Sequence, residues 1–222
     1  MKILDNSKPG RRGLTVLQGG RCGRISRAFV VPANPRTAAQ TGARRAFAKV
    51  AARWQTLTAD ARNAWGMAAA VQNTLPRPGW PRRLTGWQLF MKINCSLAML
   101  GIEQVSVPPP FQRFTDNPVG ALAITNAGGV ISLKLDCSAQ PGANTTVRAA
   151  APCSQGLAYC GDYRFLGVLP PAAHGSSDIT SLYAARYGSP AVGTKVFVRV
   201  NQNVNGWEDV PVEVSAIVPP AA

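Results

Sequence analysis

The sequence predicts an α+β protein in which a basic N-terminal arm and a three-helix region precede an antiparallel β-sandwich. The chain has 222 residues, 46% of them hydrophobic, which is enough to build a core. Residues 1–100 contain 17 Lys and Arg against 2 acids, a net charge of +15, whereas residues 101–222 contain 7 against 8, a net charge of −1. Apolar residues recur at helical spacing in the basic half, and period-two alternation follows it.

Residues 1–36 are expected to form a basic Gly/Arg-rich arm or hairpin. Two β-prone runs, 13–17 and 25–31, are separated by glycines. Because the arm is too polar to form a core by itself, we expect it to become ordered against an acidic protein surface or another polyanion. The candidate partner-binding residues of the arm are Arg11, Arg12, Arg21, Arg24 and Arg27.

Residues 37–102 are expected to form three helices. Thr37, Thr58 and Thr85 each precede an apolar stripe at helical spacing and are predicted N-caps. Gly101 follows the third stripe and is predicted to end that helix.

The first of these helices is predicted to be both amphipathic and basic. Phe47, Val50 and Trp54 share one face and are expected to pack in the core. The candidate polyanion-binding residues of this helix are Arg44, Arg45, Lys49 and Arg53. Two tryptophans beside a Pro-Arg-Arg sequence, Trp80 and Trp87, are candidate interface anchors.

Residues 103–118 are rich in proline and are expected to form a stiff linker. Residues 119–222 then contain short β-prone runs separated by Gly, Pro and Asn, a pattern typical of an antiparallel β-sandwich. One short helix is expected within residues 178–188, with Asp178 as its N-cap and Gly188 as its C-cap.

The sequence offers little support for catalysis or metal binding. Its one histidine, His174, is expected in an exposed loop. Together with Cys137, Cys153 and Cys160 it could supply a Cys3His zinc site, but the spacing fits no close zinc-ligand pattern. We therefore expect reduced structural thiols, no metal and no cofactor, while a disulfide between Cys153 and Cys160 stays open. The N-terminal segment lacks the apolar stretch of a secretory signal, and no apolar run reaches membrane-spanning length, so we expect a soluble protein made in the cytoplasm.

Several motifs, in order, resemble a group of uncharacterised phage and prophage proteins. The basic half carries Asn34-Pro35-Arg36-Thr37-x-x-Gln40, then Trp54-x-x-Leu57-Thr58-x-x-x-Arg62-x-x-Trp65, then Thr85-Gly86-x-x-x-Phe90. The second half carries Arg164-Phe165-Leu166-Gly167 and Gly193-x-Lys195-Val196-Phe197-Val198. Those proteins combine an N-terminal NPRTxxQ helical region with a C-terminal fibronectin/immunoglobulin-like domain.

The resemblance implies a virion context, and together with the basic arm it leads us to expect a non-enzymatic virion structural protein, capsid-associated or a neck or tail accessory subunit. It is expected to be made in the host cytoplasm and built into the virion, with no membrane partner. Its expected partners are other virion proteins with an acidic capsid or tail surface, and a homo-oligomer is also open.

Two other function classes stay open. The residues Trp54, Leu57-Thr58, Asp60, Arg62 and Trp65 resemble the helix junction of an HMG box, which implies DNA binding by the basic half. A hydrolase would require acids that converge in space, and the ten acids are scattered along the chain.

Overall fold

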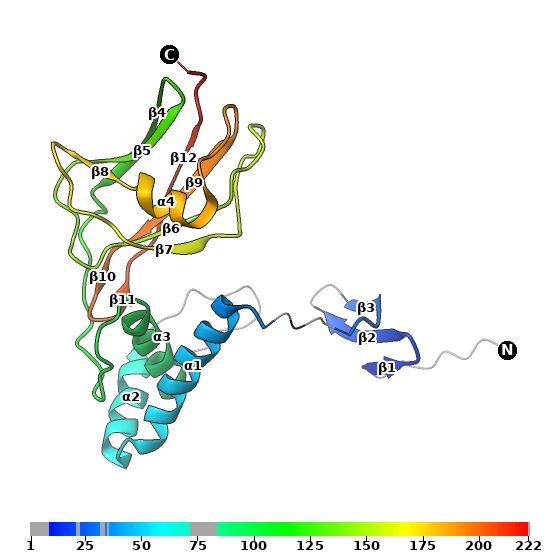
Figure 1. Ribbon diagram of the computed structural model, residues 1–222. Helices are drawn as coiled ribbons and strands as arrows, with labels where there is room; N and C mark the ends of the chain where they lie inside the picture. The colour runs from blue at the N-terminus through cyan, green and yellow to red at the C-terminus, as the bar shows by residue number, and fades with distance from the viewer. Residues whose placement is uncertain (1–8, 21–22, 32–33, 35, 72–83, 222) are drawn as a thin grey trace. The chain divides into compact units, whose positions relative to one another are not determined.

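The computed structural model describes residues 9–20, 23–31, 34, 36–71 and 84–221 (Figure 1). The chain divides into two compact units, Met1–Ala43 and Arg44–Ala222, and the boundary falls within helix α1 (Ala38–Thr56). Helices and antiparallel sheets are both present, which confirms the α+β class. No helix among the described residues is long and apolar enough to cross a membrane.

The first unit contains a three-stranded antiparallel sheet. Its strands, in spatial order, are β1 (Gly10–Arg12), β2 (Thr15–Gly20) and β3 (Gly23–Ala28). None of the side chains described in these strands is buried. Leu14, in the β1–β2 turn, is 80% exposed, and Ile25, in β3, is 55% exposed. Within the described residues, the sheet therefore has no buried apolar face of the kind that normally stabilises a small sheet.

Three helices follow the sheet along the chain, as the sequence predicts. They are α1, α2 (Ala59–Val71) and α3 (Gly86–Met99). The Thr58 hydroxyl accepts a hydrogen bond from the Ala61 amide at 3.2 Å, so its role as a cap is confirmed. Thr85 and Gln88 form a reciprocal capping box at the start of α3, with distances of 3.3 and 2.9 Å.

The predictions for the start of α1 and the end of α3 are also confirmed. The Thr37 hydroxyl accepts a hydrogen bond from the Gln40 amide at 3.3 Å at the start of α1. Gly101 has a φ of +72° just after α3, the left-handed conformation that glycine adopts most readily at a helix end. Local sequence signals thus account for where all three helices begin and where α3 ends.

An aromatic cluster forms the core between the three helices. Trp65 and Phe90 are fully buried, and their ring centroids lie 5.2 Å apart in an edge-to-face arrangement. Helices α2 and α3 meet at two glycines: a Cβ on Gly86 would lie 2.8 Å from the Gly66 nitrogen. Only glycine permits this approach at residue 86.

The prediction that Phe47 packs in the core is wrong, because its side chain is 54% exposed. Val50, one turn further along α1, is fully buried, and Trp54 is partly buried against the same cluster. Phe47 instead borders a shallow depression together with Trp87 and Met91 of α3. The helical spacing correctly places Phe47 on the same face of α1 as Val50. At the position of Phe47, however, α3 does not cover that face.

Two antiparallel sheets follow in the second half of the chain. The three-stranded sheet has the order β4 (Val119–Ala127), β5 (Val130–Cys137), β8 (Ser176–Asp178). The four-stranded sheet has the order β12 (Val212–Ile217), β9 (Lys195–Asn201), β6 (Thr146–Ala149), β7 (Arg164–Val168). Strand β8 was not predicted, because its three residues, Ser-Ser-Asp, carry no strand signal.

The two sheets and helix α4 (Thr180–Tyr187) share one hydrophobic core. Alternate residues of β9 and β5 are fully or almost fully buried in it, among them Val198 and Leu135. Tyr183 of α4 is also fully buried, and its hydroxyl donates to the Ala150 carbonyl at 3.1 Å. Burial without charge neutralisation raises the pKa of this tyrosine.

The predicted caps of α4 hold in part. Gly188 is the C-cap, with a φ of +76°. At the other end the N-cap is Ile179, which makes no side-chain capping bond. The Asp178 carboxylate instead accepts a hydrogen bond from the Thr180 amide at 2.8 Å. Hydrogen bonds from Thr180 lower the pKa of Asp178, since they favour the charged carboxylate.

A short hairpin joins the four-stranded sheet to the helices. It consists of β10 (Asn203–Val204) and β11 (Trp207–Glu208), and its turn residues Asn205 and Gly206 both have positive φ values. Trp207 is 4% exposed and packs in the helical core. A Cβ on Gly206 would lie 2.6 Å from the Ile93 side chain of α3, so the hairpin turn lies directly on that helix.

Polar contacts reinforce this junction. The Glu208 carboxylate accepts from Ser96 of α3 at 2.9 Å and from Arg148 of β6 at 3.2 Å. Ser96 in turn accepts from the Asn203 amide at 2.7 Å. Helix α3, the hairpin and the four-stranded sheet are therefore held in one hydrogen-bonded network.

The proline-rich segment at residues 103–118 packs along this junction. The Ser106 carbonyl accepts from the Trp65 indole at 2.9 Å, and the Pro109 carbonyl accepts from the Trp207 indole at 3.3 Å. Phe114 packs against the helical core. The segment makes contacts on both sides and is not a free spacer.

Candidate partner-binding surfaces

The sheet of the first unit places arginines on both of its faces. Arg11 of β1, Val16 of β2 and Arg27 of β3 are directly opposite one another, so they share one face. Arg12 is adjacent to Arg11 in β1 and lies on the other face. The Arg11 guanidinium is stacked 3.7 Å from the centre of the Phe29 ring, and its Nε donates to the Gly13 carbonyl at 2.9 Å.

The remaining arm residues are described less fully. Arg24 lies in β3, where its backbone pairs with Gly19. Arg21 lies outside the described residues. Besides the arginines, the described part of the unit exposes four large apolar side chains. These are Leu14, Ile25, Val30 and Val31, between 55% and 80% exposed.

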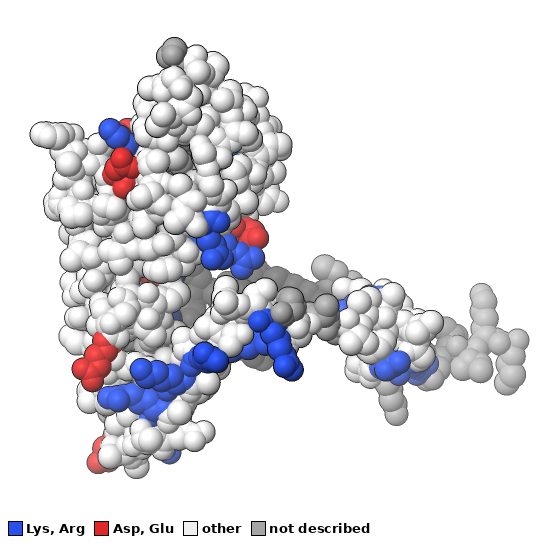
Figure 2. Space-filling model, in the orientation of Figure 1, with Lys and Arg blue, Asp and Glu red and all other residues white. Residues whose placement is uncertain are grey.

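Helix α1 carries a second basic surface, and Figure 2 shows Lys and Arg side chains gathered over this helix. Arg45, Lys49 and Arg53 are spaced four residues apart and form one stripe. Arg44 is offset from this stripe by one residue, about 100° around the helix axis. Arg44, Arg45 and Lys49 are exposed, and Arg53 is half-buried.

The candidate anchor Trp87 lies at the edge of the helical core. Trp87 is half-buried in α3, with its ring centroid 5.5 Å from that of Trp54, and it borders the shallow depression beside Phe47. Its indole therefore stabilises the helical core as well as lining a surface. Trp80 lies outside the described residues.

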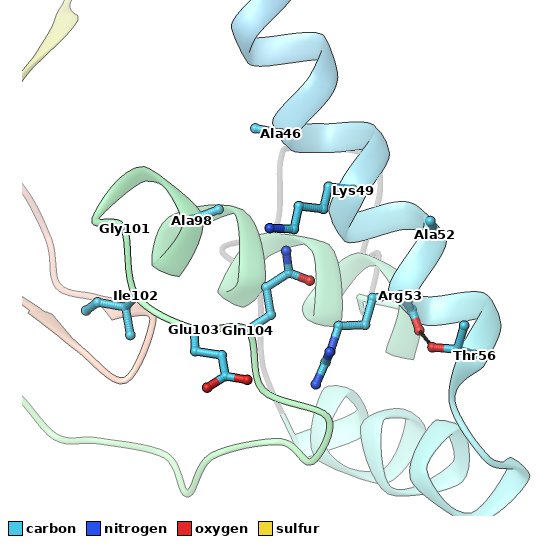
Figure 3. A pocket seen from close by; sticks show the side chains of 10 residues that line it. All are labelled: Ala46, Lys49, Ala52, Arg53, Thr56, Ala98, Gly101, Ile102, Glu103 and Gln104. Carbon is cyan, nitrogen blue, oxygen red and sulfur yellow. Dashed lines mark hydrogen bonds between the residues drawn. The ribbon is translucent and has the colours of Figure 1, made fainter.

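A groove of ≈ 690 Å³ lies between α1 and the segment that follows α3 (Figure 3). The side chains of Lys49, Arg53, Glu103 and Gln104 point into the same space from its two sides. Sequence reasoning identified the two cations but missed Glu103 and Gln104. No local signal marks these two residues, because only the packing of α1 against α3 brings them opposite the cations.

The residues considered for zinc or catalysis are dispersed. Cys137 is buried in the sheet core, and His174 is exposed in a turn with a φ of +50°. Cys153 and Cys160 are neighbours and both are free thiols; burial and the neighbouring Cys160 raise the pKa of Cys153. In the part of the chain that the structure describes, no three His, Cys, Asp or Glu side chains are grouped as metal ligands would be.

Acidic and tyrosyl side chains on the four-stranded sheet form a separate polar cluster. The Tyr163 hydroxyl donates to Glu213 at 3.2 Å, and the Arg199 guanidinium lies 4.2 Å from the centre of the Tyr163 ring and pairs with Glu213. Burial and the Glu213 charge raise the pKa of Tyr163 to about 12. A tyrosine that stays protonated over the physiological range acts here as a hydrogen-bond donor that orients the ion pair.

In comparisons with known proteins, no family model matches this chain, and neither a curated protein nor a solved structure matches it. The function proposed below therefore rests on the chemistry of the basic surfaces and the groove.

Proposed function

We propose that this chain is a bacteriophage virion structural protein, a capsid-associated or neck or tail accessory subunit that assembles through its basic N-terminal arm. The observation that carries the proposal is that the described part of the first unit exposes arginines of the β1–β2–β3 sheet together with the large apolar side chains of Leu14, Ile25, Val30 and Val31. A surface that combines both groups is complementary to a protein surface with acidic and apolar patches. The partner then supplies the apolar contact that this sheet lacks.

The chemistry of the arm favours a protein partner over nucleic acid. Phosphates would be bound by Arg11, Arg12 and Arg27, but a phosphate backbone offers little to the exposed Leu14 and Ile25 side chains. An acidic virion protein surface would cover both. In this proposal the role is one of assembly, with no catalysis and no cofactor, and the protein ends in the virion after synthesis in the host cytoplasm.

The topology of the second unit supports an immunoglobulin- or fibronectin-like description of its sheets. The two larger sheets of this unit have the orders β4-β5-β8 and β12-β9-β6-β7. If their seven strands are lettered A to G along the chain, these orders are A-B-E and G-F-C-D. The constant-type immunoglobulin order has A-B-E-D on one sheet and C-F-G on the other. The two orders agree except that the fourth strand here pairs with the third. We propose that this domain is displayed outward on the particle.

The test of the arm is a variant in which all five candidate arginines are replaced by serine. They are Arg11, Arg12, Arg21, Arg24 and Arg27. The free energy of unfolding should be unchanged, because none of the described side chains among them is buried. Quantitative mass spectrometry of gradient-purified, nuclease-treated particles should find the wild-type chain at a fixed copy number and the variant absent.

A matched control removes the same charge from exposed positions of the second unit. The control positions are Lys92, Arg113, Lys134, Arg164 and Arg186, each replaced by serine. This control should incorporate as the wild type does. Normal incorporation of the arm variant, or absence of the wild-type chain from particles, would contradict the proposal.

The second candidate function, DNA binding, is favoured by the stripe of Arg45, Lys49 and Arg53 on α1. Cations four residues apart on one helix face can contact successive phosphates. This candidate predicts that affinity for duplex DNA falls linearly on a log-log plot against salt, and that each lost cation reduces the slope by about 1. Fluorescence anisotropy with a labelled duplex measures this directly, and affinity that is independent of salt would exclude it.

A further inference from the structure

The groove beside α1 contains polar atoms that the fold leaves without partners. The Arg53 Nη2 donates to the Ser106 hydroxyl at 3.1 Å, but the Arg53 Nε is buried and has no hydrogen-bond partner. The Gln104 Oε1 is likewise buried and unpartnered. One is a donor and the other is an acceptor, and both belong to side chains that line the same groove. Leaving such an atom unsatisfied is unfavourable, so folded proteins contain few of them.

Charge in the groove is also incompletely paired. Lys49 is exposed, and within the described residues it has no ion-pair or hydrogen-bond partner. Glu103 lies across the groove and forms no ion pair with Lys49 or Arg53 (Figure 3). The groove therefore offers two cations on one side and two acceptors, a carboxylate and an amide oxygen, on the other.

This combination selects between the two ligand classes that a basic surface could bind. A phosphodiester backbone presents acceptors only, and it would place its oxygens against the Glu103 carboxylate and the Gln104 Oε1. A peptide with acidic side chains presents carboxylates for Lys49 and Arg53 and backbone N–H donors for the two acceptors. The peptide satisfies both sides of the groove, and the nucleic acid satisfies one.

Small side chains give the groove the shape for a peptide backbone. Four of its lining residues are small, namely Ala46, Ala52, Ala98 and Gly101, so a main chain can approach closely there. Ile102, 39% exposed at the edge, offers one apolar contact. The volume of ≈ 690 Å³ falls within the range of about 300–1,000 Å³ that is usual for ligand sites.

We propose that the groove between α1 and residues 101–104 binds an extended acidic segment of a partner protein. Lys49 and Arg53 bind its carboxylates, and Gln104 and Glu103 accept hydrogen bonds from its backbone. The inference deepens the proposed function and rests on it for the acidic protein partner, but it assigns that partner a second binding site in the second unit. Rotamer changes of the long Arg53 and Gln104 side chains turn their unpartnered atoms toward the segment.

The test uses the full chain and a fluorescein-labelled octapeptide of alternating Glu and Ala, followed by fluorescence anisotropy. The wild type should bind it saturably, and the corresponding Gln-Ala octapeptide should not bind. Lys49→Gln should weaken binding by about tenfold, the cost of one charge-assisted hydrogen bond. Ala52→Glu should abolish binding by placing a carboxylate in the groove. The variant should fold, because residue 52 is exposed and glutamate is a good helix former.

The matched control is Arg45→Gln, which removes one charge from the same stripe at a position that does not line the groove. Its affinity should stay within about twofold of wild type, because Arg45 does not line the groove and forms no direct hydrogen bond with the peptide. Equal losses in Arg45→Gln and Lys49→Gln would overturn the proposal, since they would show diffuse charge attraction. Displacement of the peptide by a single-stranded oligo-dT of equal charge would overturn it as well.

The arm variant separates this inference from the proposed function. Replacing the five arm arginines by serine should leave the affinity of the groove for the peptide unchanged, because none of these residues lines it. If the peptide binds through Lys49 while the arm variant still enters particles, the groove stands and the arm proposal fails. If the arm variant is excluded from particles but the octapeptide does not bind, the arm stands and the groove proposal fails.

Discussion

The two units differ in whether the apolar side chains of their antiparallel sheets are exposed or buried. In the β1–β2–β3 sheet, Ile25 is 55% exposed, whereas Val196, Val198 and Val200 of β9 are fully buried. The difference lies in what covers each sheet. In the second unit the two larger sheets and α4 share one hydrophobic core, and in the first unit no described residue buries the sheet. We propose that a partner supplies the cover that the described residues of the first unit do not.

The largest expected effect is at the junction that makes the second unit a single structure. Trp207→Ala should lower the free energy of unfolding by about 3–5 kcal/mol, because it removes a buried indole from the helical core. Urea unfolding followed by far-ultraviolet circular dichroism measures this loss. Val210→Ala, at a neighbouring position that is 83% exposed, should change it by less than about 0.5 kcal/mol. A loss below about 1 kcal/mol for Trp207→Ala would show that the hairpin does not stabilise the helices.

A smaller effect is expected at the start of α4 and should depend on pH. The pKa of Asp178 in the folded protein is below its ordinary value of 3.8, so the carboxylate stabilises the fold above that pH. This stabilisation should be lost as the pH falls from 3.8 through the folded pKa. Since the carboxylate is exposed and screened, we expect less than about 1 kcal/mol.

Asp178→Asn is the matching variant, because asparagine keeps an oxygen that can accept from Thr180 but does not titrate. The difference in free energy of unfolding between wild type and variant should be constant at about pH 6 and should shrink as the pH falls below 3.8 through the folded pKa. A difference that stays constant as the pH falls through this range would show that the charge of Asp178 is not coupled to folding.

The smallest effect on stability is expected in the arm, where the comparison is sharpest. Ile25→Ser should change the free energy of unfolding by less than about 0.5 kcal/mol, because the side chain is mostly exposed. The corresponding Val198→Ser should cost several times more, since Val198 is fully buried. Despite its neutral effect on stability, Ile25→Ser should reduce incorporation into particles. Unchanged incorporation would show that the Ile25 side chain makes no apolar contact with a partner that assembly requires.

Much of the helical region could be predicted from the sequence because its signals are local. Thr58, Thr85 and Gly101 each act within one turn of the chain, and the structure shows each in its predicted role. The longer strands were predicted for the same reason: apolar alternation in β5 and β9 reads directly as one buried face.

The parts that could not be predicted depend on contacts between distant residues. Trp207 belongs to the helical core although it follows β9, because its hairpin extends to α3. Phe47 has the helical spacing of a core residue, but it meets only the edge of α3 and stays exposed. Glu103 and Gln104 enter the groove only through the packing of α1 against α3. None of these arrangements leaves a periodic trace in the sequence.

The most direct test of the contrast between the two units is amide hydrogen exchange, measured by mass spectrometry on the free protein and on purified particles. In the free protein, peptides from β2 and β3 should exchange far faster than peptides from β9 and β5, because exposed strands without a core open readily. In particles, the β2 and β3 peptides should become strongly protected while β9 and β5 change little. Equal protection of the arm in both samples would contradict the claim that a partner completes its fold.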